Sequence, residues 1–280
     1  MTTTTAPTPP APPAAAPGSS AGFGRLLIAE WTKLRSVRST VWSLLLLAVL
    51  TWGFTALFTW LTVSQWDKSD RSQQQQIIND PVGLILGAGF QLSQLAICVL
   101  GVMVMATEYS TGMIRSSLLA VPKRIPMLLA KSVVFVALVF VVGEVVAFVS
   151  FFLGAPIVHS KAPVALGDPG VLRAVIGAGL YLAMLGLFAL AVGAIVRHVA
   201  GAITGIIGFV LVLAPLAQLL PGSLGDHIHA YLPTEAGHLI AQARQGPNDL
   251  LTPWQGFGVF AIWTAALLAL AAYLLDRRDA

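Results

Sequence analysis

The side chains that could do chemistry are few, because only 10% of the 280 residues are charged. Glu144 lies in the apolar run Val141-Val142-Gly143-Glu144-Val145 and is the only acidic residue inside any of the long apolar segments. A carboxylate in lipid costs at least ~2.5 kcal/mol, so we expect Glu144 to face other helices or to carry a proton. Two interpretations stay open: a point on a substrate or proton path, or a structural hydrogen bond to a neighbouring helix.

Histidines near the C-terminus form a second candidate group, with His227, His229, Glu235 and His238 close together in the sequence. Two histidines at i and i+2, followed by a third nine residues later, could bind a metal ion. The spacing matches no established metal site, so polar residues at the rim of a loop are the simpler interpretation. Cys98 is the only cysteine, which excludes an internal disulfide, and we expect it to be a small buried apolar residue.

The phosphate-binding loop GxxxxGK[ST] is absent, because no lysine in the chain follows a glycine. If ATP drives this protein, the ATP and Mg²⁺ must be bound by another chain. We therefore expect no cofactor, no metal and no catalytic residue here, and no contact with nucleic acid. An intramembrane enzyme would need a nucleophile–base pair or a metal-binding set, which a lone glutamate does not supply.

These side chains are carried by a membrane protein. Hydrophobic residues make up 56% of the chain and the mean hydropathy is +0.82, whereas a soluble domain carries about 25% charged residues. That composition excludes a soluble enzyme, a disordered scaffold and a secreted disulfide module. Six segments each exceed the ~20 apolar residues that cross a bilayer as a helix, the only open-ended spanning structure. The sequence predicts an all-α fold with six transmembrane helices near 41–63, 82–106, 131–154, 174–196, 200–220 and 254–275.

The positions of the basic residues predict the orientation. With the N-terminus inside, eleven Lys and Arg residues lie on the inner side and five on the outer side, which favours cytoplasmic N- and C-termini in the cell membrane. Residues 1–21 are rich in Pro, Ala and Thr without a charged side chain, and predict a disordered tail before a single six-span domain over 22–280. The long outer loop, 221–253, mixes prolines with apolar stretches and predicts short helices that dip into the outer leaflet.

Residues 22–38 predict an amphipathic interfacial helix. Its apolar face contains Phe23, Leu26, Leu27, Trp31, Leu34 and Val37. One residue breaks the pattern, because Glu30 projects into that apolar face. The helix is either a simple basic anchor in the headgroup layer or a surface on which a partner docks.

The inner loop 108–124 is long and mixes apolar residues with charges of both signs. Gly112 permits a turn, Pro122 ends a short helix, and Ile114, Leu118 and Leu119 share one helical face. An exposed apolar face on a cytoplasmic loop either binds a partner or rests on the bilayer.

Two of these segments carry a family resemblance. The inner loop resembles the loop after the second helix of ABC-2-type transporter permeases in the pattern Glu108-Tyr109-x-x-Gly112-x-Ile114-Arg115-x-x-Leu118, followed by Pro122 and Arg124. The amphipathic segment is similar to the elbow helix of the same family in the pattern Glu30-Trp31-x-Lys33-x-Arg35. The six predicted spans also match, and the resemblance covers about residues 22–280.

The resemblance implies a non-catalytic permease subunit that pairs with a second copy or a paralogue and carries two separate ATP-binding subunits. Glu108, Tyr109, Gly112, Ile114, Arg115 and Leu118 would then form the coupling loop that contacts the ATPase, and Arg197 with His198 would form a second contact. ATP-driven closure would export a substrate, which the apolar spans suggest is amphipathic. The alternative is a secondary transporter or channel that is driven by an ion gradient and uses Glu144.

Overall fold

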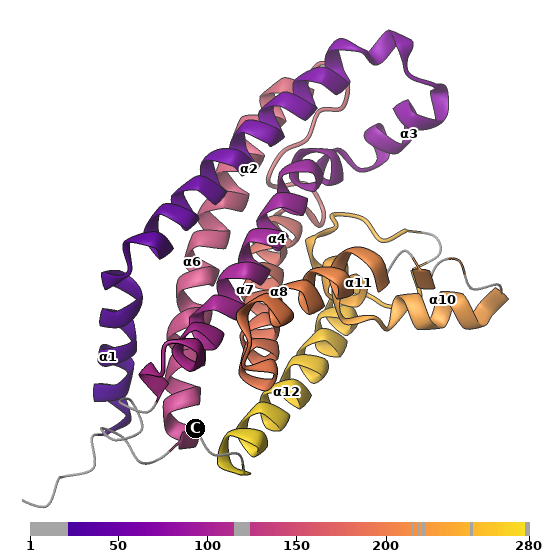
Figure 1. The fold of residues 1–280 in the computed structure, drawn as a ribbon. Coiled ribbons are helices and arrows are strands. Elements are labelled where there is room, and N and C mark those ends of the chain that lie inside the picture. The colour runs from indigo at the N-terminus through magenta and orange to yellow at the C-terminus, as the bar shows by residue number, and fades with distance from the viewer. Residues whose placement is uncertain are drawn as a thin grey trace, which may run out of the picture.

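The computed structural model describes residues 22–114, 124–213, 216–217, 219, 222–246 and 249–277. The predicted tail over 1–21 and two residues of the predicted coupling loop, Arg115 and Leu118, lie outside this part of the chain. The residues that it describes form helices and turns without a strand, as the all-α prediction requires (Figure 1).

Five helices are long and apolar enough to cross a membrane, and each contains one of the predicted spans. They are α2 (Arg38–Ser64), α4 (Pro81–Ser110), α6 (Arg124–Val158), α7 (Val171–Val196) and α12 (Pro253–Arg277). The shorter elements are α1 (Phe23–Ser36), the 3₁₀ turn η1 (Trp66–Lys68), α3 (Arg71–Asn79), α8 (Val199–Gly208), the π-helical turn η2 (Phe209–Leu213), α10 (Gly222–Ala230), α11 (Pro233–His238) and the 3₁₀ turn η3 (Leu239–Ala241).

The sixth predicted span, 200–220, is not confirmed as a long regular helix by the residues that the structure describes there. α8 ends after ten residues and continues into η2. Gly201, Gly205 and Gly208 lie in α8, and glycine is the weakest helix former after proline. A π turn also interrupts the regular hydrogen-bonding ladder. A second difference is that α6 begins at Arg124 rather than near 131, so Lys131 lies two turns inside the helix.

The contacts between helix ends define two opposite ends of the bundle. At the end that we call the elbow end, α1 contacts the first turns of α6, and the last turn of α12 contacts Arg124 and Arg197. At the other, the vestibule end, the first turns of α7 and α12 surround α11 and η3. The described chain begins and ends at the elbow end (Figure 1). Because Arg197 lies at the elbow end and Ile240 at the vestibule end, the chain returns between them through α8.

α7 is the central helix and packs against α4, α6 and α12. Its contact with α4 is close, because a Cβ atom placed on Gly101 would lie 2.5 Å from the Gly186 carbonyl oxygen and 2.9 Å from the Ala189 Cβ. Small residues permit such approach of two membrane helices, where packing replaces the hydrophobic effect as the driving force. Cys98 is fully buried in the same α4 segment, as predicted.

Replacing Gly101 by alanine therefore pushes α4 away from α7. We expect Gly101→Ala to lower the free energy of unfolding in detergent by about 1–3 kcal/mol, the usual cost of overpacking. Gly53→Ala is the matched control, because the space around Gly53 in α2 is open and alanine is the better helix former. Equal stability of the two variants would contradict the close α4–α7 contact.

Candidate functional site: the ion-pair cluster at the elbow end

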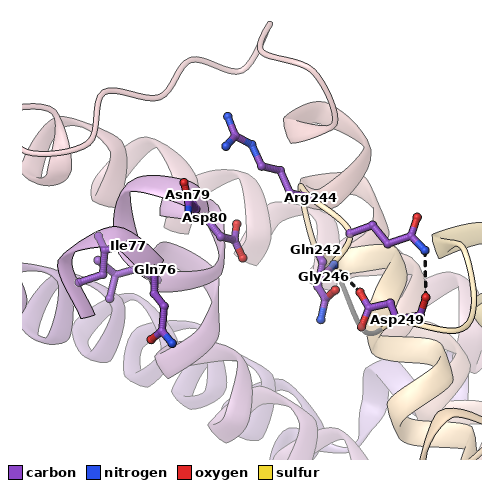
Figure 2. A pocket seen from close by; sticks show the side chains of 10 residues that line it. Gln76, Ile77, Asn79, Asp80, Gln242, Arg244, Gly246 and Asp249 are labelled. Carbon is purple, nitrogen blue, oxygen red and sulfur yellow. Dashed lines mark hydrogen bonds between the residues drawn. The ribbon is translucent and has the colours of Figure 1, made fainter. Parts of the chain in front are cut away.

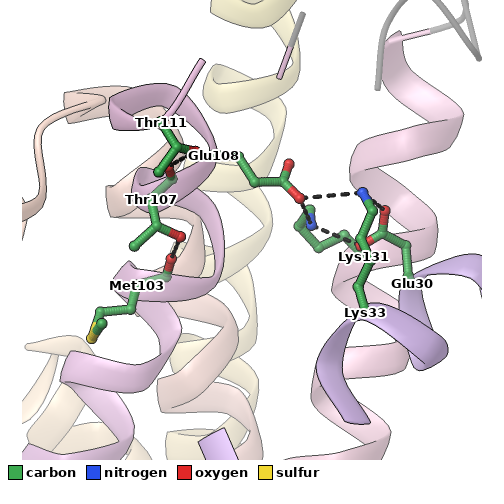
Figure 3. Close-up of polar contacts among 7 residues, drawn as sticks. All are labelled: Glu30, Lys33, Met103, Thr107, Glu108, Thr111 and Lys131. Atoms are coloured by element: carbon green, nitrogen blue, oxygen red, sulfur yellow. Dashed lines mark hydrogen bonds and ion pairs between the residues drawn. The ribbon is translucent and has the colours of Figure 1, made fainter. Parts of the chain in front are cut away.

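Four charged side chains from three helices meet at the elbow end in what we call the elbow cluster: Glu30 and Lys33 of α1, Glu108 of α4 and Lys131 of α6. The Lys131 ammonium donates hydrogen bonds to both carboxylates, at 2.7 Å to Glu30 Oε2 and 2.7 Å to Glu108 Oε1. The Lys33 ammonium donates to Glu30 Oε1 at 2.9 Å and to Glu108 Oε1 at 3.3 Å. Figure 3 shows the two lysines lying between the carboxylates.

Burial separates this cluster from an ordinary surface ion pair. Lys131 is 2% exposed, Glu30 5% and Glu108 6%, whereas 37% of the Lys33 side chain is exposed. Removing one partner of a buried pair leaves a buried charge without compensation, whereas the intact group is neutral overall. The cluster therefore requires α1, α4 and α6 to be held together.

Glu30 explains the break in the amphipathic pattern of α1. Leu26, Glu30 and Leu34 are the buried residues of that helix, spaced by four, and the carboxylate lies on the same face as the two leucines, toward α6. Two other residues predicted to be functional in this helix, Trp31 and Arg35, are exposed. The part of the apolar face that contains Leu26 and Leu34 thus packs against the bundle and delivers one acid to a buried lysine, whereas Phe23, Trp31 and Val37 are exposed.

The pKa values of the two α1 residues follow from this geometry. Burial raises the pKa of Glu30, but Lys131 and Lys33 lower it by more, so it lies below its ordinary value of 4.5. Burial lowers the pKa of Lys33, but its contacts with Glu30 and Glu108 outweigh that effect and raise it above 10.5. Both groups are therefore charged at neutral pH. Among the described residues, Glu108 Oε2 is buried without a hydrogen-bond partner.

Two arginines close the same end of the bundle around the last turn of α12. Arg124, the first residue of α6, donates to the Leu275 carbonyl oxygen at 2.7 Å, and Arg197 donates to the Leu274 carbonyl oxygen at 3.1 Å. The Arg197 guanidinium also lies 4.8 Å from the centre of the Tyr109 ring. Cations are favourable at a helix C-terminus, where carbonyl groups lack partners within the helix.

The ends of the loop between α4 and α6 are thus tied to three other elements. Before the loop, Glu108 is tied to α1 and Tyr109 to the turn after α7. After it, Arg124 is tied to α12 and Lys131 to α1. This arrangement can transmit a displacement of the loop to the whole elbow end.

Comparison with known protein families decides the assignment, because the sequence pattern of the ABC-2 family transporter proteins matches residues 26–215, more than half of the chain. The chain belongs to the ABC-2 transporter family. No curated protein matches the sequence. The matched range of this ABC-2 family member contains all four residues of the elbow cluster, whereas α10, α11 and α12 lie beyond it.

The described part of the predicted coupling loop of this ABC-2 family member differs in one respect from the expected exposed apolar face. Gly112 has a positive φ of 71°, a conformation that glycine adopts without strain. Ile114, however, is 2% exposed, because its side chain packs into the core, and the neighbouring Met113 is exposed instead. His198 is exposed and its Nδ1 caps α8 by accepting a hydrogen bond from the Gly201 amide at 3.1 Å.

Glu144 lies apart from the elbow cluster, 13 residues further along α6 and so about 20 Å away at the helical rise. Its carboxylate packs against Gly179 of α7. Both carboxylate oxygens are buried and neither has a hydrogen-bond partner among the described residues. Of the two interpretations left open for Glu144, the structural hydrogen bond to a neighbouring helix is therefore not formed within the described part of the chain.

The histidine-rich segment lies at the vestibule end. His229 Nε2 is 3.5 Å from Glu235 Oε2, and the His238 ring packs against Phe90 and Tyr181 with centroid distances of 5.7 and 6.0 Å. Burial holds the pKa of His238 below its ordinary value of 6.5 despite the nearby acids Glu235 and Asp80. Across the described residues, no group of three His, Cys, Asp or Glu side chains could hold a metal ion.

Removing the central lysine isolates two buried carboxylates. We expect Lys131→Met to lower the free energy of unfolding by about 3–5 kcal/mol. Lys33→Met is the matched control, because that half-exposed lysine contributes less than about 1 kcal/mol. Chemical unfolding in detergent measures both variants, and similar small losses in the two would contradict the assignment of Lys131 as the centre of the cluster.

The lowered pKa of Glu30 predicts that the stabilisation provided by the elbow cluster depends on pH. Its stabilising contribution is fully present above the ordinary pKa of 4.5 and is lost as the pH falls through the lower pKa of the folded state. We therefore expect the difference in unfolding free energy between wild type and Glu30→Gln to be constant above pH 4.5 and to shrink below it. A difference that grows on acidification would show that the folded-state pKa of Glu30 is raised.

Proposed function

We propose that this ABC-2 family member is the permease subunit of an ATP-driven exporter. In this proposal it forms the translocation path with a second copy or a paralogue, and two separate ATP-binding subunits drive it. The elbow cluster is the observation that carries the proposal, since it ties both ends of the loop between α4 and α6 to α1. The absence of a GxxxxGK[ST] loop in this chain agrees with ATP binding on a partner.

The geometry suggests how an ATPase would act on the permease. A force on residues 111–123 reaches α1 through Glu108 and Lys131, and reaches α12 and the α7–α8 turn through Arg124 and Arg197. Each of these contacts is a charged hydrogen bond, which is stronger and more directional than an apolar contact. The elbow end then moves as one body, in the manner of a rigid-body switch.

The elbow end faces the cytoplasm in this proposal, and the protein lies in the cell membrane. Both ends of the described chain lie there, together with Arg25, Lys33, Arg35, Arg38, Arg124, Lys131, Arg197 and Arg277. Cytoplasmic ends of membrane proteins carry an excess of Lys and Arg. The α1 helix then lies near the inner leaflet, where its exposed apolar residues meet lipid or the partner.

The transported molecule is amphipathic in this proposal, and Glu144 lies on its path. An ion-gradient-driven transporter or channel that uses Glu144 is not favoured by membership of the ABC-2 family. Glu144 is nevertheless a buried carboxylate without a partner in the described part of the chain, as expected of a group that meets a substrate or a proton.

Reconstitution tests the proposal. The chain should co-purify with a soluble ATPase that carries the phosphate-binding loop, and vesicles containing both should transport substrate only with ATP and Mg²⁺. Transport that survives ATP depletion but collapses with the proton gradient would overturn the proposal.

Replacing one carboxylate tests the role of Glu144. We expect Glu144→Gln to impair transport severalfold while membrane insertion and unfolding temperature stay unchanged, because the amide keeps the shape and loses the charge. Thr204→Ser, an exposed polar position on α8, is the control for a mild change inside the membrane domain. Wild-type export by Glu144→Gln would show that the carboxylate has no part in transport.

A further inference from the structure

A hollow of about 700 Å³, lined by both apolar and polar side chains, lies at the vestibule end between the end of α3, the start of α4 and residues 242, 244–246 and 249 (Figure 2). Its volume is within the range of small-molecule sites. The polar side chains that line it include two acids, one base and three amides: Asp80, Asp249, Arg244, Gln76, Asn79 and Gln242. The hollow lies at the opposite end of the bundle from the elbow cluster.

Charges of both signs line this hollow without neutralising one another. Asp80 Oδ1 accepts a hydrogen bond from the Gly83 amide at 3.0 Å, and Asp249 Oδ2 accepts one from the Gly246 amide at 2.6 Å. Each carboxylate thus keeps one oxygen without a protein partner among the described residues. Arg244 forms no ion pair with either acid in the same part of the chain. In Figure 2, Asp80 and Arg244 extend from different walls of the hollow.

Four amide side chains line the hollow. One of them is hydrogen-bonded to the wall, and the other three can bond to a ligand. Gln245 donates to the Leu251 carbonyl oxygen at 3.2 Å and, more weakly, to the Asp249 carbonyl oxygen at 3.4 Å, which holds its side chain against these two residues. Gln76, Asn79 and Gln242 make no side-chain hydrogen bond to another described residue. The wall at Asp249 is therefore held in place, while donors and acceptors face the hollow.

We propose that this hollow binds a zwitterion, a small group that carries one ammonium and one anionic centre. The ammonium lies at Asp80 and Asp249, the anion lies at Arg244, and the three amides orient the group between them. A lone anion would meet two carboxylates and a lone cation would leave Arg244 without a partner, so the two charges together fit best. The same chemistry occurs in a free peptide and in an ammonium–phosphate lipid headgroup.

In an exporter, the exported molecule would bind in this hollow as it leaves the membrane. This role in export depends on the proposed function. The binding itself does not, because it needs neither the ATPase nor ATP. Calorimetry on the purified full chain in detergent, without ATPase, therefore separates the two claims. Triglycine and glycerophosphoethanolamine are the zwitterionic probes, and N-acetyl-triglycine, triglycine amide and ethanolamine are the singly charged controls.

We expect at least one zwitterion to bind about tenfold or more tightly than the singly charged compounds, because each charge-assisted hydrogen bond contributes separately. Preference for glycerophosphoethanolamine identifies a headgroup, and preference for triglycine identifies a peptide. Asp80→Asn and Arg244→Gln should each weaken binding about tenfold. Asn is as good a helix cap as Asp, so Asp80→Asn keeps the start of α4 intact.

Asp67→Asn is the matched control, because this exposed acid lies at the same end of the bundle outside the hollow. Its affinity for the zwitterion should equal that of wild type. Absence of zwitterion binding at millimolar concentration, equal binding of a singly charged compound, or the same loss in Asp67→Asn would each overturn the proposal.

Discussion

The pairing of Lys131 with Glu30 and Glu108 constrains the rest of the elbow end. A lysine that is 2% exposed is stable in a folded protein only when acidic partners accompany it, and these partners come from segments 101 and 23 residues away. α1 therefore packs on the bundle through a face that contains a carboxylate, and α4 ends where its last turn can supply the second one. The position of three helices thus depends on one ammonium group.

The two arginines extend this constraint to the rest of the bundle. Arg124 and Arg197 hold the last turn of α12, and Arg197 also contacts Tyr109, the residue next to Glu108. Four residues near the ends of the α4–α6 loop, Glu108, Tyr109, Arg124 and Lys131, therefore have charged or aromatic links to other elements. A membrane subunit of an ABC transporter has to convert movement of a partner ATPase into movement of helices, and such links suit that task.

Much of the fold follows from the sequence because lipid leaves apolar segments little choice but to form helices, so α2, α4, α6, α7 and α12 were predictable. The π turn at Phe209–Leu213, inside the predicted span 200–220, was not, because hydropathy does not register the hydrogen-bonding pattern of a helix. Only part of the elbow cluster could be predicted from the sequence. Glu30 stood out as an acid in an apolar face, but its partner Lys131 looked like the boundary of a span. Pairing across 101 residues is a tertiary contact without a local pattern, and the beginning of α6 at Arg124 is what brings Lys131 inside.

The central claim is that the elbow cluster couples the ATPase to transport. Its most direct test is the number of substrate molecules transported per ATP by Glu30→Leu/Glu108→Leu/Lys131→Met, reconstituted with the ATPase partner. Apolar replacement of a complete buried ion group is often neutral or stabilising, so this variant should fold, and its ATPase partner should still hydrolyse ATP. The account predicts that the ratio falls severalfold, because the charged links between the loop and α1 are gone. An unchanged ratio would contradict it.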